Sequence, residues 1–115
     1  MEFDDFSLVL LETNPDAPEL DEETSTNVFD GHLAHLAAAH DVGHLIGAGP
    51  ARDGVALRGL CLTTLSPEEA CAWSETDPAV QAGVFAVRVL PWKVPHGAVV
   101  HADARFPRSV AEASS

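Results

Sequence analysis

The chain has 115 residues, of which 46% are hydrophobic, a length and composition typical of one globular domain with its own core. Its formal net charge is −12, and residues 1–51 contain eleven acidic residues but no Lys or Arg, which disfavours nucleic acids and anionic membranes as partners. No apolar run in the chain is long enough to span a membrane, and the acidic start is unlike a signal peptide. The chain has only two cysteines, so we expect a cytoplasmic protein with reduced thiols.

The first part of the chain predicts a strand followed by a helix. Residues 6–12 read FSLVLLE, with apolar side chains on both faces, as in a strand buried on two sides. After a loop with two prolines, Asp21 is a candidate N-cap for a helix. The apolar face of that helix consists of Phe29, Leu33, Leu36, Ala37 and His40. Gly31 interrupts the helix, so its start could instead lie later, with Asp30 as the cap.

Two short strands and a second helix are expected next. Gly43 is a natural terminator of the first helix. Strands are predicted over residues 44–49 and 56–65, separated by a turn at residues 51–54 (ARDG). Residues 66–69 (SPEE) have the features of a helix start, with Ser as N-cap, Pro at the first position and Glu completing a capping box.

A last helical turn and a last strand complete the pattern. Asp77 and Pro78 open the turn, and residues 84–92 alternate as a strand does. After Pro95 the pattern is lost, and residues 109–115 predict a disordered tail.

The element order β-α-β-β-α-β is the ferredoxin-like arrangement of the α+β class, a four-stranded antiparallel sheet with two helices on one face. Because residues 6–12 and 84–92 carry apolar side chains on both faces, the second face needs a cover. A second copy packed sheet against sheet would supply it, so we expect a homodimer. A cleft beside or between the sheets is then the expected site for a small-molecule ligand.

Residues 32–50 and 57–95 resemble the YciI-like family, the YCII-related domain of the dimeric α+β barrel superfamily. The motifs that carry the resemblance are His32-Leu33, Gly49-Pro50, Asp77-Pro78 and Gly83, in the family's order and spacing. The resemblance covers about residues 6–95, so we expect a YciI-like domain at residues 1–95 and a partly disordered C-terminal extension at residues 96–115. It implies a dimeric barrel with a His–Asp pair, here His32 and Asp77, in an active-site cleft.

The resemblance also implies an activity. It suggests proton abstraction or elimination, lyase-like or dehydrochlorinase-like, on a small cyclic or aromatic metabolite, with His32 as the base and Asp77 as its orienting partner. The family often has an aromatic residue after its Asp-Pro, whereas this chain has Ala79 and no Tyr at all. The alternative is therefore a non-catalytic ligand-binding or accessory dimer.

The residues themselves allow structural readings as well. His32 borders the apolar face of its helix and could simply cap the edge of the core. Asp77 is an ordinary N-cap, a role compatible with pairing because a carboxylate has two oxygens. Arg88, mid-strand among apolar neighbours, would meet either a ligand anion or an acid across the dimer. Trp92, on the same face by the strand period, would line the cleft or the dimer seam.

Other candidates are weaker. His32 and His35 form HxxH on a helix, but His35 is expected to point to solvent, and we predict neither a metal site nor a cofactor. An anionic substrate would need Arg58 or Arg88 gathered in one pocket. Both cysteines, Cys61 and Cys71, are expected to be small buried apolar residues.

Overall fold

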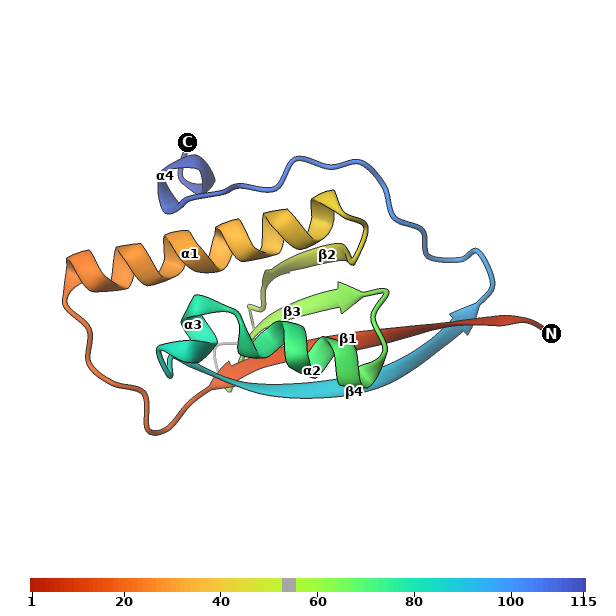
Figure 1. Cartoon of the computed structure of the whole chain (residues 1–115), viewed down its shortest axis with the longest axis horizontal. Coiled ribbons are helices and arrows are strands. Elements are labelled where there is room, and N and C mark those ends of the chain that lie inside the picture. Colours follow the sequence, from red (N-terminus) through yellow and green to blue (C-terminus); the bar gives the residue numbers. More distant parts are fainter. Residues whose placement is uncertain (53–55) are drawn as a thin grey trace.

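The computed structural model describes residues 1–52 and 56–115, and its elements follow the predicted order (Figure 1). They are β1 (Phe3–Thr13), α1 (Glu22–Asp41), β2 (Leu45–Pro50), β3 (Leu57–Thr63), α2 (Pro67–Glu75), α3 (Pro78–Gln81), β4 (Phe85–Pro95) and α4 (Val110–Ala113). The sheet order is β2-β3-β1-β4, and every neighbouring pair is antiparallel. This confirms the ferredoxin-like α+β fold. The turn predicted at residues 51–54 lies largely outside the described residues.

Helix α1 begins at the earlier of the two predicted starts. The side chain of Asp21 accepts a hydrogen bond from the Thr24 backbone N–H at 2.7 Å, which caps the helix. Gly31 therefore lies inside α1, where the structure gives it a packing role. A Cβ atom at this position would lie 2.9 Å from Cγ of Pro78 at the start of α3. Without a side chain at Gly31, α1 and α3 can lie in close contact.

The first turns of α2 and α3 are fixed by side-chain caps, as the sequence predicts. Ser66 and Glu69 form the reciprocal capping box at the start of α2. Asp77 caps α3 by accepting from the Ala79 backbone N–H at 2.9 Å. This cap fixes one carboxylate oxygen of Asp77 and leaves the other free for a second partner.

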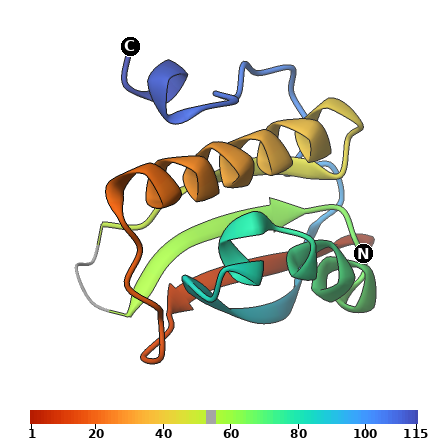
Figure 2. The ribbon, with the colours of Figure 1, turned by 60° about the vertical axis from the view of Figure 1, so that its left-hand side comes forward.

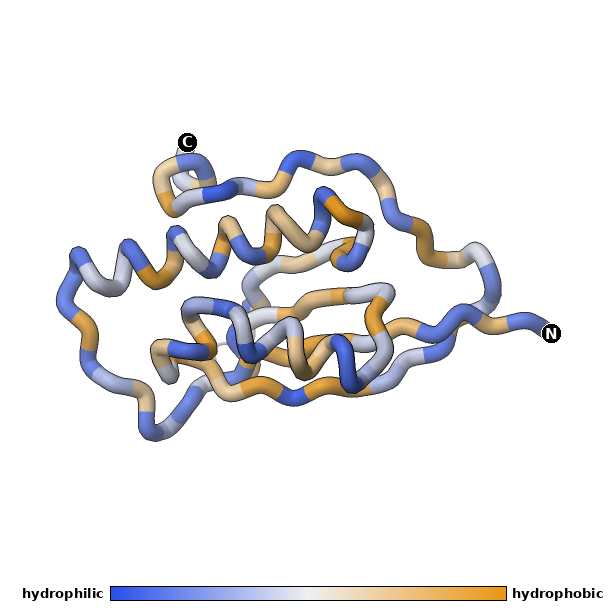
Figure 3. Tube along the Cα trace, viewed as in Figure 1, coloured by the Kyte–Doolittle hydropathy of each residue, from blue (hydrophilic) through white to orange (hydrophobic). Residues whose placement is uncertain are grey.

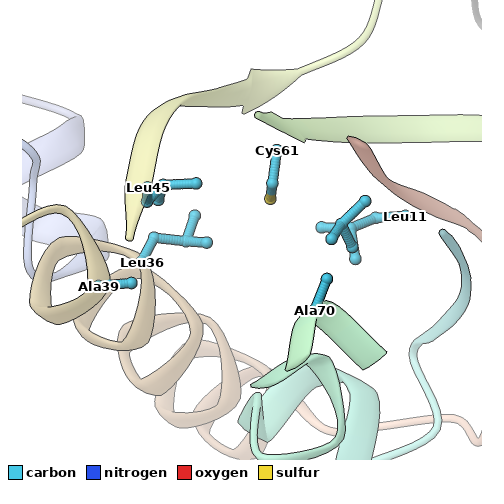
Figure 4. Packing of buried hydrophobic residues seen from close by; sticks show 7 residues of the cluster. Leu11, Leu36, Ala39, Leu45, Cys61 and Ala70 are labelled. Carbon is cyan, nitrogen blue, oxygen red and sulfur yellow. The ribbon is translucent and has the colours of Figure 1, made fainter. Parts of the chain in front are cut away.

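One face of the sheet packs against the helices and forms the core. Alternate residues of β1, among them Val9 and Leu11, point to this face and are buried. Val9 pairs with Cys61 of β3 and Val89 of β4, which carries the same face across three strands. The core cluster consists of Val9, Leu11, Leu36, Ala39, Leu45, Cys61 and Ala70 (Figure 4). It joins the sheet to α1 and α2, which therefore cover the same face.

The opposite face of the sheet is apolar and partly exposed. Leu8 lies between Leu62 of β3 and Leu90 of β4, and Phe6 pairs with Trp92. Leu90 and Trp92 of β4 are large hydrophobic side chains on this face and are 38% and 41% exposed. In Figure 3, hydrophobic residues run along the middle of the strands, whereas the first turns of α1 are mostly hydrophilic. The expected second copy against this face remains a prediction.

The edge strand β4 ends in an unusual sequence. It contains Pro91 and Pro95, with Lys93 between them, and within residues 1–52 and 56–115 it pairs with β1 alone.

Residues 96–115, here called the C-terminal strap, run back along α1 on the side away from α2 and α3 (Figures 1 and 2). Where the sequence predicts a disordered tail over residues 109–115, the structure has the single helical turn α4, capped by Ser109. Its backbone is tied to α1, because the Val110 N–H donates to Asp30 at 2.8 Å. The sequence of the strap has no periodic pattern that would predict an ordered segment, because the strap is held by contacts with α1 rather than by contacts within itself.

None of the helices in the described part of the chain has the length and hydropathy needed to cross a membrane.

Candidate functional site

His32 and Asp77, which the sequence places 45 residues apart, meet where α1 crosses the start of α3. Nδ1 of His32 lies 2.7 Å from Oδ2 of Asp77. Both residues are buried, with exposures of 8% and 3%. The other oxygen of Asp77 is held by the Ala79 N–H that it caps. The carboxylate is therefore positioned by the backbone of α3 before it meets the imidazole.

This contact defines the orientation of the His32 ring. A carboxylate oxygen accepts, so Nδ1 carries the hydrogen and donates it to Asp77. In the neutral ring, Nε2 is then the atom with a free lone pair. Across residues 1–52 and 56–115, no hydrogen bond is formed to that atom. The imidazole is surrounded by Phe29 and Phe85, whose ring centres lie 6.2 and 5.6 Å from its own.

A cavity of about 480 Å³ lies between α1, the β2–β3 side of the sheet and the strap. His32 lines it, and Asp77 does not, so the carboxylate lies behind the imidazole as seen from the cavity. The aromatic part of the lining consists of Phe29, Phe85 and Phe106. Such a cavity is large enough for a small ring compound and has a polar group at a defined place.

The basic residue at this cavity is Arg58, not Arg88. Arg58 of β3 is among the residues that line the cavity, although the strand period turns it to the face opposite Gly59 and Cys61. Arg88 lies on the opposite face of the sheet, 3.3 Å from a carboxylate oxygen of Glu12, with more than half of its side chain exposed. Trp92 shares that face. The two residues predicted to contact the ligand are thus separated from His32 by the sheet, because the strand period turns them away from the helices.

His35 lies next to the pair, although its position on the helical wheel predicted a solvent-facing side chain. That prediction is wrong: only 14% of the side chain is exposed, and its ring stacks on Trp73 of α2 at 4.7 Å. Nδ1 of His35 lies 3.9 Å from the Asp77 carboxylate and is buried without a hydrogen-bond partner among the described residues. Burial lowers the pKa of His35, an effect that the negative charge of Asp77 partly opposes.

The hydrogen bond with Thr76 shows which ring nitrogen of His35 carries the hydrogen. The Thr76 hydroxyl donates to the Trp73 carbonyl at 2.7 Å, so it accepts from Nε2 of His35 at 3.0 Å. In the neutral ring Nδ1 then presents a lone pair toward Asp77. The helical wheel gave the wrong exposure for His35 because it assumes a single covered face, whereas Trp73 of α2 covers α1 at a second place.

The two cysteines differ in environment. Cys61 is buried at the cavity wall, and burial, with a smaller contribution from the charge of Asp77, raises the pKa of its thiol to about 12. It is therefore a protonated thiol at neutral pH and a poor nucleophile. Cys71 is exposed on α2, which contradicts the expected burial. It lies next to the buried Ala70, one position away from the face of α2 that packs on the sheet.

In residues 1–52 and 56–115, no three His, Cys, Asp or Glu side chains come together as the ligands of a metal ion would. The HxxH motif of α1 instead places two imidazoles beside one carboxylate, with Nδ1 of His32 at 2.7 Å and Nδ1 of His35 at 3.9 Å from Asp77.

Comparisons with known proteins agree with this fold. One solved structure that the chain resembles is 5-chloro-2-hydroxyhydroquinone dehydrochlorinase from Burkholderia phenoliruptrix AC1100, in complex with 2,5-dihydroxybenzoquinone. The TM-score is 0.54 and the identity 20%, over 80% of this chain and 95% of that one. No curated protein sequence matches. The model of the YCII-related domain matches residues 6–93, and the chain belongs to that family.

Proposed function

We propose that the cavity beside His32 binds a small cyclic or aromatic hydroxy compound and that His32 removes a proton from it, with Asp77 as the orienting partner. The observation that carries the proposal is the 2.7 Å contact between Nδ1 of His32 and Asp77, with the same imidazole at the cavity wall. This arrangement leaves Nε2 to accept a proton from a ligand. The negative charge of Asp77 stabilises the imidazolium that results.

The neighbouring structure suggests the reaction. A dehydrochlorinase removes the elements of HCl: a base takes a proton, the carbon–chlorine bond breaks, and chloride leaves with the bonding electron pair. In this chain Nε2 of His32 would take the proton. Phe29 and Phe85 offer apolar surface to the ring itself.

The test uses a chlorinated hydroxyhydroquinone as substrate and chloride release as the measurement. We expect release by the wild-type protein, and a loss of at least a hundredfold in His32→Gln, because general base catalysis contributes about 10²- to 10⁴-fold. Asp77→Asn should also reduce the rate, because it removes the charge that stabilises the imidazolium. Arg88→Gln is the matched control, since Arg88 lies across the sheet from the cavity.

The competing function is non-catalytic binding. It is favoured by the predominantly apolar lining of the cavity, whose described residues include one histidine, His32, and one arginine, Arg58, but no Asp, Glu or Lys. Binding of 2,5-dihydroxybenzoquinone without chloride release from any chlorinated substrate would support it and would contradict the base role of His32.

We also propose that the protein acts as a homodimer through the exposed sheet face that carries Leu90 and Trp92. Support comes from the exposure of these side chains within an apolar surface. Trp92 would then belong to the dimer seam, and Arg88 to its rim.

A further inference from the structure

We propose that the C-terminal strap forms one wall of the candidate cavity and that Phe106 in it determines how far a ligand can extend on that side. The inference rests on the proposed function only in assuming that this cavity is where the ligand binds. It concerns a segment beyond the part of the chain that the family model matches, which ends at residue 93.

The strap is held on α1 by a buried histidine. His40 is 2% exposed, and its Nε2 accepts from the Ala104 backbone N–H at 3.2 Å. Its Nδ1 lies 2.9 Å from the Leu45 carbonyl oxygen, which can only accept. One ring nitrogen accepts and the other donates, so the imidazole is neutral and its tautomer is set by two backbone groups.

Further contacts act on both sides of His40. The ring stacks between His101, at 4.4 Å, and Phe106, at 4.2 Å. The guanidinium of Arg108 lies 2.7 Å from the Asp41 carboxylate at the end of α1. Because its contacts with α1 extend from residue 101 to residue 110, the strap has a defined position against the helix.

This position brings strap residues to the cavity. Phe106, Pro107 and Ala113 are part of its lining, together with Leu36 of α1 and Ala48 of β2. Phe106 also packs against the core cluster and stacks on His40, so its ring is held by contacts with the rest of the fold. A supported ring at a cavity wall limits the length of a ligand on that side, because it cannot move aside without breaking its other contacts.

Shortening this side chain should lengthen the cavity. In Phe106→Ala the space of the ring becomes available to the second ring of a longer ligand. The probes are phenol and 1-naphthol, which carry the same hydroxyl group on one and two fused rings. Binding is followed by NMR through the backbone amides of Ala48 and Cys61, which lie at the cavity wall.

We expect the affinity for 1-naphthol relative to phenol to rise at least tenfold in Phe106→Ala over the wild type, since each additional buried carbon of the ligand strengthens binding several-fold. Phe106→Trp should change the ratio in the opposite direction. Val100→Ala is the matched control, because Val100 lies in the strap with 67% of its surface exposed and should leave the ratio unchanged.

An unchanged ratio in Phe106→Ala would overturn the inference, and so would the absence of binding of both probes to all the proteins. A failure of the proposed function would look different. In that case His32→Gln would leave chloride release unaffected, or no release would occur at all, while the gain in 1-naphthol affinity would persist.

Discussion

Replacing Gly31 with Ala tests whether close helix packing holds the His32–Asp77 pair together. The added Cβ would lie 2.9 Å from Cγ and 3.1 Å from Cβ of Pro78, up to half an ångström closer than the 3.4 Å at which ordinary contact begins. Pro78 is a rigid ring at the start of α3, so it cannot swing aside as a long side chain would. The two helices must therefore separate.

The free energy of unfolding combines two opposing effects. Alanine is favoured over glycine inside a helix by about 1 kcal/mol, whereas overpacking costs about 1–3 kcal/mol. We expect a net loss of between about 0 and 2 kcal/mol in urea unfolding. Because residue 31 precedes His32 and residue 78 follows Asp77, the hydrogen bond of 2.7 Å should lengthen and the NMR signal of its Nδ1 proton should shift.

Ala38→Gly is the matched control, because Ala38 is exposed on the same helix. It should cost about 1 kcal/mol and leave the Nδ1 proton of His32 unchanged. The reasoning is refuted if Gly31→Ala stabilises the protein by as much as Ala38→Gly destabilises it, with the Nδ1 signal of His32 unmoved in both variants.

Three further predictions follow from burial and exposure. Because burial lowers the pKa of His35 in the folded protein, the unfolded chain binds a proton there more readily. The free energy of unfolding should therefore fall as the pH drops below about 6.5, the pKa of histidine in an unfolded chain. Urea unfolding at several pH values should show a smaller fall in His35→Gln, and the same dependence on pH in both proteins would contradict this. Iodoacetamide should label Cys71 in the folded protein and not Cys61, whose thiol pKa is raised to about 12; mass spectrometry of Cys71→Ser, where no label is expected, is the check. Leu90→Lys should convert a dimer to a monomer in sedimentation at micromolar concentration, and a wild-type protein that sediments as a stable monomer would exclude the sheet-to-sheet dimer.

The fold could be predicted because its signals are local. The caps at Asp21, Ser66 and Asp77 mark helix starts within a few residues, and the alternation in residues 84–92 marks a strand. The meeting of His32 and Asp77 came from the family resemblance, since nothing in the spacing of two residues 45 positions apart indicates contact. The Asp77-Pro78 pair indicates a helix cap, but it does not indicate that the second carboxylate oxygen of Asp77 contacts the imidazole of His32.

The surroundings of the site could not be predicted in the same way. The strand period shows that Arg88 and Trp92 share a face, but not which face the helices cover. His35 is covered because the ring of Trp73 in α2 stacks on it, a contact between two helices that no periodicity in the sequence reports. For the strap, the available signal was Phe106, an isolated aromatic residue in a segment without periodicity, which is the kind of residue that anchors such a segment.

The prolines of β4 have a consequence for how copies of the chain can associate. The outer edge of a sheet offers unpaired N–H and C=O groups that can capture a further strand, which is a common route to fibres. Proline has no N–H to contribute, and Lys93 between Pro91 and Pro95 adds a charge that resists capture. A continuous ladder therefore cannot grow outward past this end of β4, so the edge next to the exposed Trp92 is protected from strand capture while the apolar surface of the sheet stays open to a second copy.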